Sequence, residues 1–322
     1  MKETAMVSVN PVICLVDWNF VQLFVHSSFF WTRKSIYFFP FGYNFVGFFL
    51  LLQRKKNFIN AMKTFISPES WFSIAYPDAW FEFEGESDAF LFYNPDEWNG
   101  NFRISAYRGE HSDYGRCCMD EELRLRGTRS VQLGRWRAAQ SEERFREDGE
   151  AYVSYCWTVD AGQTCVECSF TTKADATAAV GEQIVASMQV NPVGTYFRQQ
   201  LIPVRLVEMV EIDEAVAQAE VLAKKLLKAR FNSLQQGVDV LQRLSSTPEV
   251  QRMGTDGSAM LGLTLCSLIV EEVEGFEWRT WVDGTDELPV MVNDGQHVIH
   301  PLTLFAGEKE NLDVQAMLDG IL

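Results

Sequence analysis

The chain has 322 residues, 28 Lys and Arg against 44 Asp and Glu, a formal net charge of −16 and 47% hydrophobic residues. This composition excludes a wholly disordered chain, and the length predicts two domains. Phosphate recognition needs clustered Lys and Arg, so the acidic balance also argues against a nucleic-acid-binding protein.

The first 61 residues differ from the rest of the chain. They contain 11 of the 24 Phe, six Lys and Arg, and two Asp and Glu, which gives a charge of +4. Residues 62–322 contain 22 basic and 42 acidic residues and carry −20. A run without charge, residues 35–52, lies between Arg33-Lys34 and Arg54-Lys55-Lys56. About 19 residues suffice for a membrane-spanning helix, although Pro and Gly within the run weaken that interpretation.

Residues 1–61 are therefore a doubtful leader with more than one interpretation. Met62 begins Met-Lys-Thr-Phe-Ile-Ser-Pro-Glu-Ser, an ordinary start for a globular domain. The residues before it are rich in Phe, Leu, Lys and Asn and resemble translated AT-rich DNA. This favours a misplaced start codon, and a native N-terminus before residue 35 would exclude it. The alternative is an envelope-associated protein anchored by residues 35–52, which carbonate washing of membranes would test. Other interpretations remain open.

Residues 63–190 show the short alternating runs of an antiparallel α+β domain. The expected strands are 72–77, 80–84, 89–93 and 102–107, followed by a helix over 119–126 with acidic residues in its first turn. A long hairpin follows, turning at 160–162, with Val153, Tyr155, Trp157 and Val159 on one face. A helix over 174–188 closes the domain, and Asn-Pro-Val-Gly at 191–194 predicts a boundary.

The order of these elements resembles the PsbP-like, or Mog-type, fold. The resemblance is carried by Phe-Ser-Ile-x-Tyr-Pro-x-x-Trp at 72–80, the long hairpin, and a final helix that ends in Ser-Met-Gln-Val at 187–190. It implies an antiparallel sheet flanked by helices. Members are mostly binding, assembly or adaptor proteins, and relatives act as effector chaperones in bacterial secretion. The resemblance therefore implies a binding protein more than an enzyme.

Residues 195–322 predict a second α+β domain, of helices and a small antiparallel sheet. Apolar positions recur at helical spacing over 212–229 and 234–244. A third helix, predicted over 258–274, is nearly all apolar from Met260 to Val270, which is typical of a central helix. An alternating run over 276–282 and short strands at 288–292 and 297–299 predict the sheet. A last helix covers 312–322.

This second half resembles a bacterial domain of unknown function. The shared features are an apolar helix before Glu-Trp-x-x-Trp-Val-Asp at 277–283, then Pro289-Val290 and the step His300-Pro301. In Bacteroides-like bacteria that domain is paired with the PsbP-like one. The resemblance implies no established activity and supplies no catalytic residues.

The cysteine and histidine patterns do not predict a reactive site. Cys165 and Cys168 are three residues apart on a strand, so their side chains point to opposite faces, and we expect Cys168 to be buried and Cys165 outward. Seven cysteines without a framework spacing suit a reducing compartment. His297 and His300 would likewise diverge and lack further ligands. No nucleophile elbow, phosphate loop or calcium loop is present, so we predict no catalytic residue, cofactor or metal.

The candidate partner-binding residues are Trp278, Trp281, Asp283 and His300. Trp278 and Trp281 fall on opposite faces of one strand, so one is expected in the core and the other on the surface. Arg103, Arg108 and Arg116 also gather near aromatic residues, which a solvated sheet face explains as well as a site does.

The expected function is that of a non-enzymatic, cytoplasmic adaptor, chaperone or immunity-type protein. Its partner would be a protein, and an acidic body attracts basic partners. We expect no nucleic acid, and a membrane only if residues 35–52 form an anchor.

Overall fold

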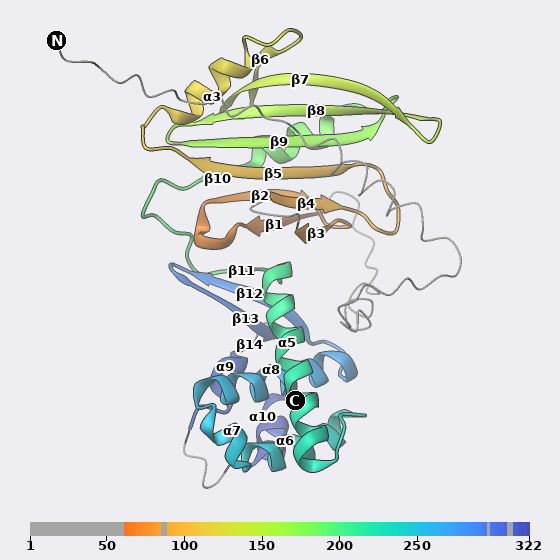
Figure 1. Cartoon of the computed structure of the whole chain (residues 1–322), viewed down its shortest axis with the longest axis vertical. Coiled ribbons are helices and arrows are strands. Elements are labelled where there is room, and N and C mark those ends of the chain that lie inside the picture. The colour runs from red at the N-terminus through yellow and green to blue at the C-terminus, as the bar shows by residue number, and fades with distance from the viewer. Residues whose placement is uncertain (1–60, 85–88, 295–296, 308–311) are drawn as a thin grey trace, which may run out of the picture. The chain divides into compact units, whose positions relative to one another are not determined.

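The computed structural model describes residues 61–84, 89–294, 297–307 and 312–322 (Figure 1). The leader before residue 61, and with it the charge-free run 35–52, lies outside these described residues. Among the described helices, none combines the length and apolar character needed to cross a membrane. The α+β class with antiparallel sheets and flanking helices is confirmed.

The first half of the described chain, residues 62–190, is built from two antiparallel sheets. One has the order β1-β2-β10 and the other the order β3-β4-β5-β9-β8-β7-β6. Their strands are β1 Met62–Ile66, β2 Phe72–Pro77, β3 Phe81–Glu84, β4 Ala89–Tyr93, β5 Asn101–Arg108, β6 Arg129–Leu133, β7 Trp136–Glu147, β8 Glu150–Ala161, β9 Thr164–Lys173 and β10 Gln189–Val190.

An aromatic cluster joins these two sheets. The Phe65 ring lies 4.9 Å from that of Phe90 and 5.1 Å from that of Phe92, and Tyr76 lies 4.9 Å from Phe92, measured between ring centroids. Trp157, on β8, is fully buried in the same core. Large aromatic side chains bury the most apolar area per residue, so they dominate the stability of this half.

The two faces of the large sheet are covered by different helices. Gly181 of α4 (Ala179–Ser187) lies against Phe170 and Trp157, whereas Gly115 of α3 (Tyr114–Glu122) lies against the backbone of Thr164. The outward placement of Cys165 was therefore wrong: Cys165 is 1% exposed and Cys168 is 4% exposed. The two thiols do point to opposite faces, but both faces are covered.

Other elements of this half also differ from the predictions. The closing helix, predicted over 174–188, is α4, which begins five residues later at Ala179. The helix predicted at 119–126 is α3, which begins at Tyr114 and has no acidic residue in its first turn. Packing of Gly115 and Met119 against the sheet, and not the charge pattern, sets its position. The strand pair β6–β7 was not predicted, because β7 alternates poorly between apolar and polar residues and carries many charges. Strand β7 also pairs with β8, from Arg137 to Glu147.

The second half combines a sheet of order β11-β12-β13-β14 with a group of helices. The helices are α5 Leu206–Leu222, α6 Leu234–Ser245, α7 Pro248–Arg252, α8 Thr255–Glu272, α9 Pro301–Leu304 and α10 Val314–Ile321. A short π-helical segment, Ala223–Leu227, follows α5 directly. The strands are β11 Gln200–Pro203, β12 Glu277–Asp283, β13 Asp286–Val292 and β14 Val298–Ile299. Helix α5 begins six residues before the predicted start, and the short helices α7 and α9 were not predicted.

Helix α8 is the centre of this half, as its apolar sequence predicted. Its residues from Gly257 to Ile269 are buried with the exception of Ala259, and it packs against α5, α6 and α9. A Cβ atom on Gly262 would lie only 1.9 Å from the carbonyl oxygen of Pro301. The close approach of α8 and α9 therefore requires a glycine at this position.

Candidate functional site

A buried group of charged side chains links the two halves. Arg205, immediately before α5, and Glu208, in its first turn, have side chains that are 2% and 4% exposed. Nε of Arg205 donates to both Glu208 carboxylate oxygens at 3.0 Å, and Nη2 donates to Glu287 Oε2 on β13 at 2.9 Å. Nη1 donates to the carbonyl oxygen of Ile66 on β1 at 3.2 Å. One guanidinium thus connects β1, α5 and β13.

This group is satisfied, which indicates a structural role. Thr280 Oγ1 donates to Glu208 Oε2 at 3.3 Å, and the backbone N–H of Arg205 donates to Thr280 Oγ1 at 3.3 Å. Burial opposes the charged guanidinium, but its bonds to Glu208 and its interaction with Glu287 raise the pKa of Arg205 above the ordinary value. Nε, Nη1 and Nη2 of Arg205 all donate to groups of the protein itself, so this guanidinium holds the fold together and is not our candidate for binding a ligand.

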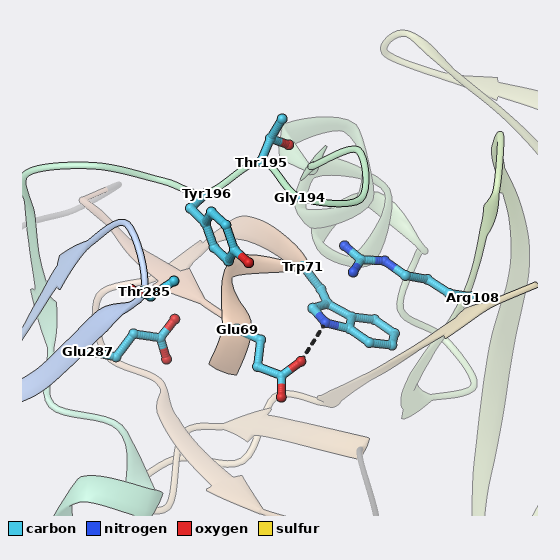
Figure 2. Close-up of a pocket in the computed structure, with 8 residues that line it drawn as sticks. All are labelled: Glu69, Trp71, Arg108, Gly194, Thr195, Tyr196, Thr285 and Glu287. Atoms are coloured by element: carbon cyan, nitrogen blue, oxygen red, sulfur yellow. Dashed lines mark hydrogen bonds between the residues drawn. The ribbon is translucent and has the colours of Figure 1, made fainter.

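A pocket of about 230 Å³ lies beside this group (Figure 2). Both halves and the segment between them contribute to its wall. The lining residues are Glu69, Trp71, Arg108, Gly194, Thr195, Tyr196, Thr285 and Glu287.

Arg108 is held in place on one side of this junction pocket. Its guanidinium carbon lies 4.1 Å from the centroid of the Trp71 ring, a cation–π contact. Its Nη2 donates to the backbone oxygen of Asn191 at 3.3 Å, while Nε is buried and has no hydrogen-bond partner in the part of the chain that the structure describes. Burial lowers the pKa of Arg108, and the negative charge of the nearby Glu69 opposes that shift. The guanidinium is therefore fixed but incompletely paired.

Glu69 occupies the neighbouring part of the wall. Its Oε2 accepts a hydrogen bond from Trp71 Nε1 at 3.1 Å, as Figure 2 shows. Glu69 and Ser70 have φ angles of 58° and 56°, which non-glycine residues rarely adopt. The Asn191 side chain donates to the Ser70 carbonyl at 2.8 Å and helps to hold this turn. Backbone strain of this kind is concentrated at functional sites.

A second concave region of about 420 Å³ lies between α5 and α8. Its walls combine apolar side chains, among them Ala215, Met260 and Leu263, with the carboxylates of Glu211, Glu214 and Asp256. Among the described residues, none of these three carboxylates forms an ion pair. Burial and the charges of Glu208 and Glu214 raise the pKa of Glu211, against the opposing charge of Arg205. We call this region the acidic groove.

The four candidate partner-binding residues do not form one cluster. Trp278 is 5% exposed and packs in the core with α8, so it is the core member of the Trp pair and cannot contact a partner. Trp281 is half-buried and lies across from Leu201 on β11 and Leu288 on β13. Asp283 ends β12 opposite Asp286, and His300 is exposed before α9. Partner binding by the three that reach the surface stays a prediction.

Two features of the junction were missed at the sequence level. Arg205 and Glu208 have the spacing of an ion pair within one helical turn, but their burial depends on β1 and β13. Arg108 was noted among arginines near aromatic residues, yet the sequence does not show that Trp71 would lie under it. Within the described residues, no cluster of His, Cys, Asp and Glu could hold a metal ion.

Two family models match the sequence. A domain of unknown function, DUF3805, matches residues 60–213, and another, DUF3806, matches residues 237–312. A crystal structure from Bacteroides thetaiotaomicron VPI-5482 is 36% identical, covers 80% of this chain and 98% of its own chain, and has a TM-score of 0.75. The chain belongs to the same protein family as this Bacteroides protein.

The two matched domains follow one another along the chain. The first match extends beyond residue 190 into α5, so the domain ranges 63–190 and 195–322 stay predictions. That this pairing typifies Bacteroides-like bacteria also stays a prediction. The descriptions of both domains assign no activity to them.

Two further solved structures match with low scores. The solution structure of cyanobacterial PsbP from Synechocystis sp. PCC 6803 is 13% identical, covers 43% of this chain and 98% of its own, and has a TM-score of 0.23. LpqN of Mycobacterium tuberculosis, described as involved in cell envelope biogenesis, is 15% identical, covers 41% and 93%, and has a TM-score of 0.29. Similarity at this level supports no functional argument. None of the curated proteins matches this chain.

Proposed function

We propose that the chain is a non-enzymatic, cytoplasmic protein-binding protein of the adaptor, chaperone or immunity type, and that its partner presents a basic, partly apolar segment to the acidic groove. The single observation that carries the proposal is the combination of apolar walls with three carboxylates that form no ion pair with a described residue. A Lys or Arg of a partner would remove the repulsion between these carboxylates.

The exposed side of α5 extends this surface beyond the groove. Val207, Glu211, Glu214, Gln218 and Val221 recur at intervals of four and three residues, so they share one stripe of the helix. Val207 is 37% exposed and Val221 is 63% exposed. The stripe therefore presents an apolar side chain at each end and carboxylates between them, which suits a segment that carries both basic and apolar residues.

Charge and cysteine chemistry agree with this proposal. The −20 charge of residues 62–322 would accelerate association with a basic partner and make the rate depend on salt. The six cysteines among the described residues are free thiols, which suits the reducing cytoplasm.

The test is affinity capture from native cell extract with the full chain and two matched variants. In the groove variant, Glu211→Gln, Glu214→Gln and Asp256→Asn remove three negative charges. In the control variant, Glu110→Gln, Asp120→Asn and Glu121→Gln remove the same charge from exposed positions of the first half.

The proposal requires one protein that the wild type and the control retain and the groove variant loses. With that protein purified, we expect roughly tenfold weaker binding for the groove variant at low salt, and a smaller difference at high salt. Equal capture by all three proteins would refute the acidic groove as the binding surface.

A further inference from the structure

The geometry points to the junction pocket as a binding site for a small zwitterion of the α-amino-acid class, with its carboxylate on Arg108 and its ammonium group on Glu69. This site is separate from the acidic groove, and its ligand is a small molecule and not a protein.

Arg108 supplies the anion-binding group. Its guanidinium rests on the Trp71 ring and is anchored to Asn191, so it is already positioned before a ligand arrives. No described carboxylate forms an ion pair with it, and Nη1 makes no hydrogen bond to another described residue. A planar guanidinium presents paired N–H donors that match a carboxylate. A ligand carboxylate would complete the pairing of this cation.

Glu69 supplies the cation-binding group. The pocket has two lining carboxylates, and Glu287 is already engaged by Arg205 Nη2 at 2.9 Å and by Ser70 Oγ at 3.4 Å. Among the described residues, Glu69 accepts a single side-chain hydrogen bond, from the Trp71 indole, through Oε2. Its Oε1 is thus available for an ammonium donor.

The two groups are separated in a way that favours one bridging ligand. Glu69 and Arg108 interact electrostatically but do not form an ion pair with each other. Trp71 sets their separation, because Arg108 lies on the face of its ring and Glu69 binds its N–H edge (Figure 2). In an α-amino acid, the carboxylate and the ammonium group are bonded to the same carbon, so one molecule would bind Arg108 and Glu69 at once.

The size and the walls of the pocket limit the ligand further. A volume of about 230 Å³ lies below the range of roughly 300–1,000 Å³ that is typical of drug-sized ligands. The rings of Trp71 and Tyr196 form apolar walls, and Tyr196 is 40% exposed, so the mouth of the pocket opens to solvent. A single amino acid fits this space better than an oligopeptide or a nucleotide.

The test uses the full chain, with calorimetry and thermal unfolding in the presence of each free L-amino acid at millimolar concentration. At least one amino acid should bind and raise the unfolding midpoint, because a ligand that binds only the folded state stabilises it. Its N-acetyl derivative lacks the ammonium group and its amide lacks the carboxylate, so each should bind at least about tenfold more weakly.

Variants assign the two charges of the ligand to their residues. Arg108→Gln should abolish binding and Arg108→Lys should weaken it, whereas the control Arg137→Gln, at an exposed position of β7, should leave it unchanged. The Glu69→Gln protein should bind the free amino acid no more tightly than its N-acetyl derivative, because the ammonium group has lost its partner. It should still bind the amide more weakly than the free amino acid. Far-UV circular dichroism checks that each variant is folded.

Three results would overturn the inference. They are the absence of binding by any free amino acid, equal binding of the N-acetyl derivative to the wild type, and unchanged affinity in a folded Arg108→Gln protein. Tighter binding of a peptide with the same C-terminal residue would also overturn it, because the site would then recognise a chain end. None of these results depends on the acidic groove, so the two proposals can fail separately.

Discussion

Arg205 Nη2 lies 2.9 Å from Glu287 Oε2, although 82 positions separate the two residues in the sequence. The same guanidinium also binds Glu208 and the carbonyl oxygen of Ile66. Near it, Ile66, Ile202 and Val282 form a small buried apolar cluster from β1, β11 and β12. The junction of the two halves thus has a charged centre and an apolar edge, and the pocket opens beside them.

Replacement of Arg205 by Met should destabilise the protein strongly. The change leaves Glu208 and Glu287 without their cation, and an uncompensated buried charge costs roughly 3–5 kcal/mol of unfolding free energy. Arg279→Met is the matched control, because its pair with Glu277 is exposed and should contribute about 0–1 kcal/mol. Urea denaturation measures both, and equal losses would contradict the role of Arg205.

Replacement of Gly262 by Ala should force α8 and α9 apart. The added Cβ would meet the Pro301 carbonyl oxygen at 1.9 Å, and overpacking of a core costs about 1–3 kcal/mol. Gly320→Ala is the control, since no described atom lies within 4 Å of its Cβ position and alanine favours the helix. We expect thermal unfolding at a lower temperature for the first variant and at an equal or higher one for the second.

The two tryptophans of β12 should respond differently to truncation. Trp278→Ala removes a buried side chain from the core and should cost roughly 3–5 kcal/mol. Trp281→Ala removes a half-buried side chain beside Leu201 and Leu288, and we expect about 1–2 kcal/mol. Chemical denaturation compares them, and a larger cost for Trp281 would reverse the assignment of the two faces.

Replacement of Glu271 by Gln should raise stability at neutral pH. Partial burial, together with the charges of Glu272, Glu220 and Asp213, raises the pKa of Glu271 in the folded protein. A raised folded pKa means that stability is full below the unfolded pKa, about 4.3, and is lost as pH rises through the folded pKa. The gain from Gln should therefore be present at pH 7 and disappear near pH 4, as followed by unfolding midpoints. A gain that persists at pH 4 would show another cause.

The cysteines should differ sharply in their reactivity toward a thiol reagent. Cys117 is exposed, whereas Cys165, Cys168 and Cys266 are buried and burial raises the pKa of each thiol. Since the thiolate is the reactive form, we expect rapid labelling of Cys117 and protection of the other three until the protein unfolds. Peptide mass spectrometry after short labelling gives the order. Early modification of Cys165 would argue against its coverage by α3.

Much of the fold could be predicted from the sequence, because its signals are local. Strands β2 and β4 and helix α6 lie almost where the sequence placed them. Strand β2 and helix α6 have periodic apolar positions, and β4 is a short continuous apolar run. All three share a clear local apolar pattern followed by a turn or a proline. The elements that were missed or displaced lack this property. Strand β7 has few apolar positions, and α3 follows contacts of Gly115 that no local pattern shows.

The candidate sites were less predictable, because each depends on segments that are far apart in the chain. The acidic groove needs α5 beside α8, and the junction pocket needs Trp71, Arg108 and Tyr196 from three separate segments. Of the partner-binding candidates, the sequence placed Trp278 and Trp281 on opposite faces but left open which one was buried.

By itself the sequence determined the acidic body, the α+β class, the apolar helix α8 and the lack of recognisable catalytic motifs, because composition and periodicity act through neighbouring residues. Only the tertiary structure decided that both faces of the large sheet are covered, that Arg205 joins three elements, and that Arg108 lies on Trp71. Those features arise from contacts between distant segments. The pairing of such segments depends on the packing of the whole chain and cannot be seen in the spacing of residues within one segment.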